Sequence, residues 1–130
     1  MLAAVSAAAL AGAGSAGAAR QCATRTVGPG KLTQGGTFGA TCLLDAYRGG
    51  CRRAEYILSS VGLTTFVVKN FSVERRGDSC TVLVFVNIAV VKQPSRVLSS
   101  QCARLRRVGA DVVADRCTGG TSAISLTTFR

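Results

Sequence analysis

Two long β-type segments separated by a short turn occupy the middle of the chain, between residues 63 and 91. Both are rich in β-branched and aromatic residues, which strands prefer. Gly77 and Asp78 stand in the polar break between them. Because glycine adopts positive φ freely and Asp tolerates it, this pair is suited to a two-residue hairpin turn. The segment therefore predicts a long β-hairpin around which the rest of the chain must fold.

This turn sets a register that sorts the side chains of the hairpin into two faces. One face is apolar apart from Lys69, and the other mixes apolar and polar residues. A slip of one residue would exchange the two faces, so the alternation itself favours this register. The apolar face holds the pairs Val73 with Val82, Phe71 with Val84, Lys69 with Val86, and Val67 with Ile88. We expect another element to cover this face and the opposite face to be largely exposed.

A segment with helical spacing lies ahead of the hairpin and is the best candidate for the cover. Apolar residues between 37 and 48 recur at the intervals of one helix face, Thr37 can act as the N-cap, and a glycine pair follows. The helix has only about three turns, so tertiary packing must stabilise it. Residues 51–60 then predict a first strand of the sheet.

A second hairpin is predicted near the C-terminus, with Gly109 and Ala110 in its turn. The register places Cys102 opposite Cys117, Arg104 opposite Asp115, and Leu105 opposite Ala114. All three pairs are chemically sensible, which supports the register. It also makes the two cysteines a hydrogen-bonded pair, with the wider Cα separation of about 5.5 Å. Residues 92–99, which contain Pro94, predict a loop, and residues 119–130 have enough apolar residues for one further strand.

These elements predict an α+β fold in a single domain over residues 37–130. One short helix packs on a curled antiparallel sheet of four to five strands, stabilised by disulfides. Residues 20–36, rich in glycine, predict an irregular lead-in. The order of a helix and then an antiparallel meander, over roughly residues 38–117, resembles the cystatin-like group of α+β folds. Inhibitory cystatins carry a Gln-x-Val-x-Gly hairpin that this chain lacks, so no functional residue is carried over.

The first nineteen residues predict a signal peptide and therefore export. They contain no charge and consist almost entirely of Ala, Gly, Leu, Ser and Val, and residues 16–18 and 17–19 both fit the pattern of a cleavage site. The alternative is a disordered Ala/Gly tail. Asn87 and Lys92 interrupt the longest later apolar run before it reaches the ~20 residues of a membrane helix. We therefore expect a secreted protein without a membrane span.

Six cysteines follow this leader, and an even number in an exported chain predicts three disulfides. Cys102 and Cys117 are the predicted pair. The other four leave three pairings open: Cys22, Cys42, Cys51 and Cys80. A zinc site is the competing interpretation, but the chain has no His, and its closest cysteines, at 42 and 51, are nine residues apart. We therefore expect no metal.

The side chains needed for acid–base or nucleophilic catalysis are scarce. The chain has no His, its six carboxylates form no paired motif, and its cysteines are expected to be oxidised. The sequence therefore predicts a non-enzymatic domain with no cofactor.

The net charge of +10 suggests an anionic partner. If the strands form a meander, seven arginines share one rim of the sheet: Arg48, Arg52, Arg53, Arg75, Arg76, Arg106 and Arg107. Guanidinium groups bind phosphate, sulfate and carboxylate with two parallel hydrogen bonds, so this rim predicts binding to an anionic polymer or cell-surface component. The simpler alternative is a well-hydrated basic surface. Few aromatic residues are available to stack on bases, which disfavours specific nucleic-acid recognition.

Two further interpretations concern the hairpin tip. A secreted inhibitor of a protease or glycosidase would present a rigid tip to its target enzyme, which suits a disulfide-bonded scaffold. Residues 76–78 also form an Arg-Gly-Asp tripeptide, the sequence that integrins recognise. Turn chemistry alone explains Gly77 and Asp78, so the tripeptide is the weaker of the two signals.

Overall fold

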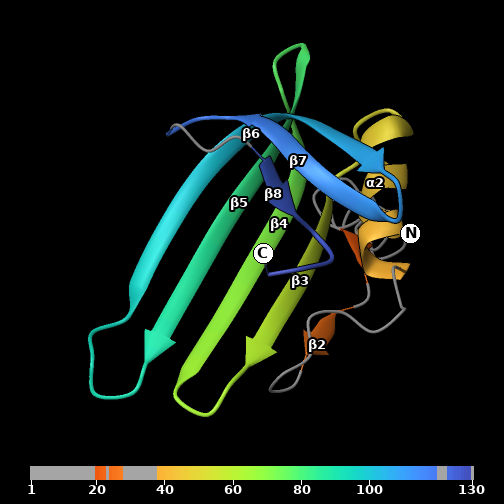
Figure 1. The fold of residues 1–130 in the computed structure, drawn as a ribbon. Helices are drawn as coiled ribbons and strands as arrows, with labels where there is room; N and C mark the ends of the chain where they lie inside the picture. Colours follow the sequence, from red (N-terminus) through yellow and green to blue (C-terminus); the bar gives the residue numbers. More distant parts are fainter. Residues whose placement is uncertain (1–19, 23, 28–37, 120–122, 130) are drawn as a thin grey trace, which may run out of the picture.

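The structure is a computed structural model that describes residues 20–22, 24–27, 38–119 and 123–129 (Figure 1). These residues form one helix and a single sheet of eight strands. Neighbours in the sheet follow the order β1-β3-β4-β5-β6-β7-β8, and β2 also pairs with β3. The elements are β1 (Arg20–Gln21), β2 (Arg25–Val27), α2 (Phe38–Arg48), β3 (Ala54–Val61), β4 (Thr65–Arg76), β5 (Ser79–Val90), β6 (Arg96–Val108), β7 (Asp111–Cys117) and β8 (Ala123–Ser125).

The central hairpin of β4 and β5 has the predicted register. Its turn contains Gly77, whose φ of 62° lies in the left-handed region that favours glycine. Val73 pairs with Val82 and Phe71 pairs with Val84, and all four side chains are at most 1% exposed. The predicted cover over the apolar face is therefore confirmed for this half of the hairpin.

Part of that cover is the predicted helix, α2. It begins at Phe38 and ends at Arg48, whereas the predicted cap, Thr37, lies outside the described residues. The helix packs against β3, β4, β6 and β7, and its Leu43 and Leu44 are at most 1% exposed. Burial of these two side chains contributes about 3–6 kcal/mol of transfer free energy. Packing rather than intrinsic helix propensity therefore stabilises this short helix.

A further part of the cover is the C-terminal segment from the end of β8 onwards. Lys69, in the middle of the apolar face, donates from Nζ to the carbonyl oxygens of Ser125 (3.2 Å) and Thr128 (2.8 Å). The same Nζ lies 4.9 Å from the ring centroid of Phe129, within cation–π distance. Asp111 accepts a hydrogen bond from Ser125 Oγ at 2.8 Å. These interactions hold the tail on the sheet and satisfy the buried ammonium group.

The predicted irregular lead-in is wrong where β1 and β2 form. Arg20 pairs with Ala54, and Arg25 pairs with Leu58, so both short strands run parallel to β3. Segments of two or three residues carry no periodic signal, and their partner lies far along the chain. The sheet is therefore mixed, with eight strands among the described residues instead of four or five antiparallel ones. Residues 28–36 of the lead-in lie outside the described residues.

The predicted loop at residues 92–99 is too long. β6 begins at Arg96, and Val97 pairs with Asn87 of β5. Pro94 restricts the backbone of itself and of the residue before it, but not of residues further on. The strand therefore resumes where Val97 and Leu98 favour extended backbone. β8 supplies the further strand predicted in the C-terminal tail.

β6 changes its partner at Cys102. Up to that residue it pairs with β5, and from there to Val108 it pairs with β7, in the predicted register of the second hairpin. Figure 1 shows that the second half of β6 bends and, with β7, crosses over the sheet towards α2. The helix therefore lies beside a folded-over hairpin, and the sheet does not curl evenly around it.

The predicted Cys102–Cys117 disulfide is confirmed, but the expected Cα separation is wrong. The two Cα atoms are 3.9 Å apart, far less than in a hydrogen-bonded pair of a regular ladder. Arg116 has a φ of 56°, and Ala103 and Arg116 are missing from the register between the neighbouring pairs. The regular alternation of the ladder therefore ends before it reaches Cys117.

The remaining cysteines pair as Cys22–Cys42 and Cys51–Cys80. All six cysteines of the chain are therefore oxidised, which is consistent with an exported protein. The predicted signal peptide, residues 1–19, lies outside the described residues.

No helix in the described part of the chain has the length and apolar character that crossing a membrane requires.

The long strands have two ends that differ in construction (Figure 1). We call the end with the β4–β5 turn at residues 77–78 the closed end. We call the opposite end, with the β3–β4 turn at residues 62–64 and the β5–β6 loop at residues 91–95, the open end. All three disulfides lie towards the closed end, since one cysteine of each contacts that half of the sheet. The Cys22 amide donates to the Glu55 carbonyl near the start of β3, Cys80 pairs with Arg75 beside the turn, and Cys102 pairs with Val82.

Candidate anion-binding site

Four of the seven predicted rim arginines belong to the region around the end of α2. The chain reverses there because Gly50 and Cys51 both have positive φ, 90° and 57°. Arg75 reaches back from β4 and donates from Nη2 to the carbonyl oxygen of Gly50 at 2.8 Å. Arg53 and Arg75 line a hollow of about 290 Å³ together with Cys51 and Glu74. Arg48 and Arg52 are exposed beside the same reversal.

Arg76 occupies the other face of the hairpin, since neighbouring residues of a strand alternate between faces. Its Nε donates to Glu74 Oε2 at 2.8 Å. Arg76 also lines a hollow of about 330 Å³ with Leu83, Phe85 and Gln101. The tip of the central hairpin therefore presents guanidinium groups on both of its faces.

The last two predicted rim arginines, Arg106 and Arg107, each donate a hydrogen bond to another side chain. Arg106 donates from Nε to Asp115 Oδ2 at 2.7 Å. Arg107 donates from Nη2 to the hydroxyl of Thr41, in the first turn of α2, at 3.3 Å. Arg106 therefore has its partner within the second hairpin, and Arg107 has its partner on α2.

Asp115 is the acid that neutralises this part of the second hairpin. Arg104 donates to both of its oxygens, from Nε at 2.8 Å and from Nη2 at 2.7 Å. Hydrogen bonds and charge from Arg104 and Arg106 hold the pKa of the Asp115 carboxyl well below its ordinary value, although its burial opposes the shift. The predicted Arg104–Asp115 pair is thus confirmed, and Arg106 joins it.

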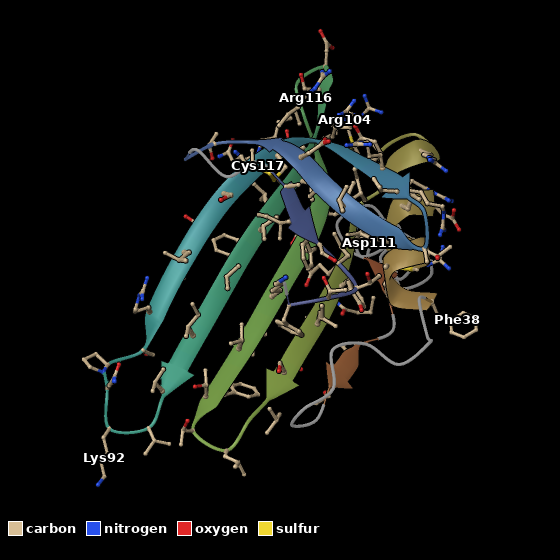
Figure 2. The ribbon with its side chains drawn as sticks, in the orientation of Figure 1. Phe38, Lys92, Arg104, Asp111, Arg116 and Cys117 are labelled. Atoms are coloured by element: carbon tan, nitrogen blue, oxygen red, sulfur yellow. A yellow bond between two sulfur atoms is a disulfide. The ribbon has the colours of Figure 1, made fainter. Side chains whose placement is uncertain are left out.

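Sequence reasoning missed Arg116, which lies at the closed end with Arg104 (Figure 2). Arg116 lines a hollow of about 500 Å³ together with Tyr47, Ser79 and Thr81. Tyr47 donates its hydroxyl proton to the carbonyl oxygen of Ala103 at 3.2 Å. The signal was present in the sequence, since Arg116 precedes a cysteine whose partner and hairpin were both predicted.

Two of the three hollows adjoin one another at the closed end. The hollow of Arg116 and the hollow of Arg76 share Gln101 and Thr118 as lining residues. These two residues are joined by a hydrogen bond from the Thr118 amide to the Gln101 carbonyl, 2.9 Å. The remaining hollow, lined by Arg53 and Arg75, shares no residue with this pair, and Arg75 and Arg76 point to opposite faces of β4. We call the four lining guanidinium residues, Arg53, Arg75, Arg76 and Arg116, the arginine cluster.

Guanidinium groups in such open hollows can bind oxyanions with paired hydrogen bonds. Hydroxyl groups of Ser79, Thr81 and Thr118 line the same space and can donate further hydrogen bonds. Glu74 is the acid within the cluster, and it already accepts from Arg76. These side chains are therefore suited to bind negatively charged oxygen groups.

Comparisons with models of known protein families, with curated proteins and with solved structures find no match to this chain. The site is therefore interpreted from its own geometry.

Proposed function

We propose that this protein is an exported, non-enzymatic binding domain whose arginine cluster binds an anionic polymer. The observation that carries the proposal is that four guanidinium groups line three hollows at the closed end, two of which share lining residues. Lone exposed arginines are ordinary on a basic surface. Arginines that line hollows, here two of them together with hydroxyl groups, are suited to hold oxyanions in fixed positions.

A polymer fits this arrangement better than a small anion does. Arg75 and Arg76 lie on opposite faces of the hairpin, so one sulfate or phosphate ion contacts only part of the cluster. A chain of repeating sulfate, phosphate or carboxylate groups can pass over the tip and contact both faces. Several such contacts formed together strengthen binding through their high effective concentration.

Three arginines of the second hairpin line none of the three hollows. Arg104 and Arg106 both donate to Asp115, whose single negative charge offsets one of their two positive charges. Arg107 is directed to Thr41 on α2. We therefore leave these three arginines out of the proposed site and expect their replacement to have a small effect.

The test is retention on heparin resin under a salt gradient. The triple variant Arg75→Ser, Arg76→Ser and Arg116→Ser is expected to elute at much lower salt than the wild type. The matched control removes the same charge elsewhere, as Arg20→Ser, Arg96→Ser and Arg107→Ser, and is expected to elute only slightly earlier. Equal shifts for the two variants would show that net charge alone governs retention, and the proposal would then be wrong.

A gain of binding gives a second test. Asp115→Asn removes the acid that holds Arg104 and Arg106, so it frees two guanidinium groups near the cluster. We expect this variant to require more salt for elution than the wild type. Circular dichroism and disulfide mapping check that each variant is folded before the comparison is made.

A second candidate function is inhibition of a hydrolase through the β4–β5 turn. Figure 1 shows this turn extending beyond the rest of the sheet, and the Cys51–Cys80 disulfide crosslinks its base. A rigid, protruding turn loses little conformational entropy when it enters an active site. Stoichiometric inhibition of a protease or glycosidase, abolished when Asp78 and Ser79 are both replaced by Gly, would favour this function over polymer binding.

A further inference from the structure

The open end of the sheet gathers most of the exposed apolar side chains. Nine large apolar residues of the described chain are exposed, and six of them flank the two connections at this end. The six are Val61, Leu63, Phe66, Val91, Val97 and Leu98. Leu63 is 92% exposed and Val91 is 60% exposed. Scattered apolar residues are normal on a surface, whereas a gathered group indicates a binding surface.

Backbone hydrogen bonds join the two connections into one surface. The Val91 amide donates to the Thr64 carbonyl at 2.9 Å, which brings the β5–β6 loop against the β3–β4 turn. Val61 pairs with Phe66, and Phe66 in turn pairs with Ala89. A hollow of about 260 Å³ lies between the two connections, lined by residues 62–66 and 89–91. Leu63, Phe66 and Val91 therefore line one hollow between the two connections, and paired strands hold them there.

The charge around this surface has one sign. The chain has no acidic residue between Glu55 and Glu74, and none between Asp78 and Asp111, so the open ends of β3 to β6 carry no carboxylate. The loop beside Val91 carries Lys92, and β6 begins with Arg96. Figure 2 shows Lys92 projecting from the loop away from the sheet. Exposed apolar side chains next to exposed cations are suited to a lipid surface, where anionic headgroups cover the hydrocarbon region.

We propose that the open end docks on an anionic lipid bilayer, with Leu63 and Val91 entering the boundary between headgroups and acyl chains. Lys92 and Arg96 then lie at the level of the lipid phosphates. A second copy of the chain is a poorer occupant, because it would bring the lysine and arginine of both molecules together. The bilayer surface supplies the opposite charge and the apolar phase at once. The open end is separate from the arginine cluster, so this proposal does not depend on polymer binding.

A single tryptophan can report the insertion directly, since the chain contains none. In Leu63→Trp, the new side chain should shift its fluorescence to shorter wavelength when vesicles of equal parts phosphatidylglycerol and phosphatidylcholine are added. The matched control is Phe38→Trp, at an 84% exposed position at the start of α2, away from Lys92 (Figure 2). We expect no shift for this control. Absence of a shift in Leu63→Trp, or an equal shift in both variants, would overturn the proposal.

Vesicle cosedimentation separates this surface from the arginine cluster. We expect Leu63→Ser with Val91→Ser to lower the partition coefficient on the same vesicles at least tenfold, because two apolar side chains leave the membrane. Arg75→Ser with Arg76→Ser should change it less than threefold. The reverse pattern would mean that the arginine cluster alone binds the vesicles. A dimer that forms in solution without lipid and is lost in Leu63→Ser with Val91→Ser would assign the surface to a second copy instead.

Discussion

The closed and open ends of the sheet are built from the same strands, but different forces hold them. At the closed end, side chains such as Val73 and Val82 are fully buried, and the three disulfides crosslink that half. At the open end the described residues contain no disulfide, and the backbone ladder continues beneath exposed apolar side chains. Stability concentrated at one end therefore leaves the other end free to present apolar surface.

Lys69 lies between these two regions and connects the tail to the sheet. The residue is 9% exposed, and its ammonium group is held by two carbonyl oxygens and one aromatic ring. An apolar residue at this position would pack against the sheet but would leave the carbonyls of Ser125 and Thr128 without this donor. Lysine at this position therefore gives up part of the free energy that burying an apolar side chain would supply. In return, its hydrogen bonds fix the C-terminal tail on the sheet.

The largest expected effect comes from opening the closed end. Replacing Cys51 and Cys80 together by Ser removes a crosslink between residues 29 positions apart. We expect the free energy of unfolding to fall by about 3–4 kcal/mol, because the unfolded chain regains the entropy of that loop. Urea denaturation under oxidising conditions measures the loss. Ser95→Ala, at the open end, serves as the control and should change the free energy by less than about 0.5 kcal/mol.

Hydrogen exchange compares the local stability of the closed and open ends directly. In the wild type, amides of Tyr56 and Val84 should exchange more slowly than those of Val61 and Phe66, since local opening is easier where fewer side chains are buried. The double cysteine variant should reduce this difference. A variant that loses less than about 1 kcal/mol, with unchanged exchange, would contradict the view that the crosslink holds the closed end.

The second effect is a dependence of stability on pH that arises from Lys69. Burial lowers the pKa of Lys69 to about 8, although the Asp111 carboxylate opposes part of the shift. Between pH 8 and about 10.5 the unfolded state binds a proton that the folded state has lost, so the free energy of unfolding rises with pH in this window. The full rise is about 3 kcal/mol. Lys69→Met should abolish it, as measured by urea denaturation at pH 7 and pH 9.5.

Lys92→Met is the control for this measurement, because its side chain is exposed in the β5–β6 loop. If Lys69→Met retained the same rise as the wild type, burial of the ammonium group could not be its cause.

A smaller effect is expected from Asp115→Asn in the folded-over hairpin. The substitution removes charged hydrogen bonds to Arg104 and Arg106, and we expect a loss of about 1–2 kcal/mol at pH 6. Because the pKa of Asp115 is lowered in the folded state, its stabilising contribution is lost as the pH falls below about 4. Thermal unfolding at pH 6 and pH 3 should therefore show the difference between variant and wild type shrinking in acid. Arg107→Ser, which leaves the Asp115 ion pairs intact, is the control.

The two hairpins show how far local sequence patterns determined the fold. The alternation of apolar and polar residues along β4 and β5, together with Gly77 in the turn, correctly predicted the four residue pairs named above for the central hairpin. The same reasoning gave the Arg104–Asp115 pair and the Cys102–Cys117 disulfide. These features depend on residues that are close in sequence, so a turn and a period of two are enough to specify them.

The candidate site was predicted less completely. Arg75 and Arg76 were placed correctly at the hairpin tip, since the turn itself positions them. Arg106 was expected to stay available, but it lies diagonal to Asp115 in the predicted register and shares that carboxylate with Arg104. Arg116 was missed, although its place beside Cys117 was predicted, because the hollow that it lines also includes Tyr47 of α2 and Ser79 of β5.

The sequence by itself determined the segments that fold on their immediate neighbours: the central hairpin, the second hairpin, the helix at residues 38–48 and the oxidised state expected of six cysteines. Only the tertiary structure decided how Cys22, Cys42, Cys51 and Cys80 pair, that β1 and β2 lie parallel to β3, and that the tail rests on Lys69. These contacts join residues far apart in the chain. The entropy lost in closing such long loops is offset by packing and disulfide bonds, which no local sequence pattern predicts.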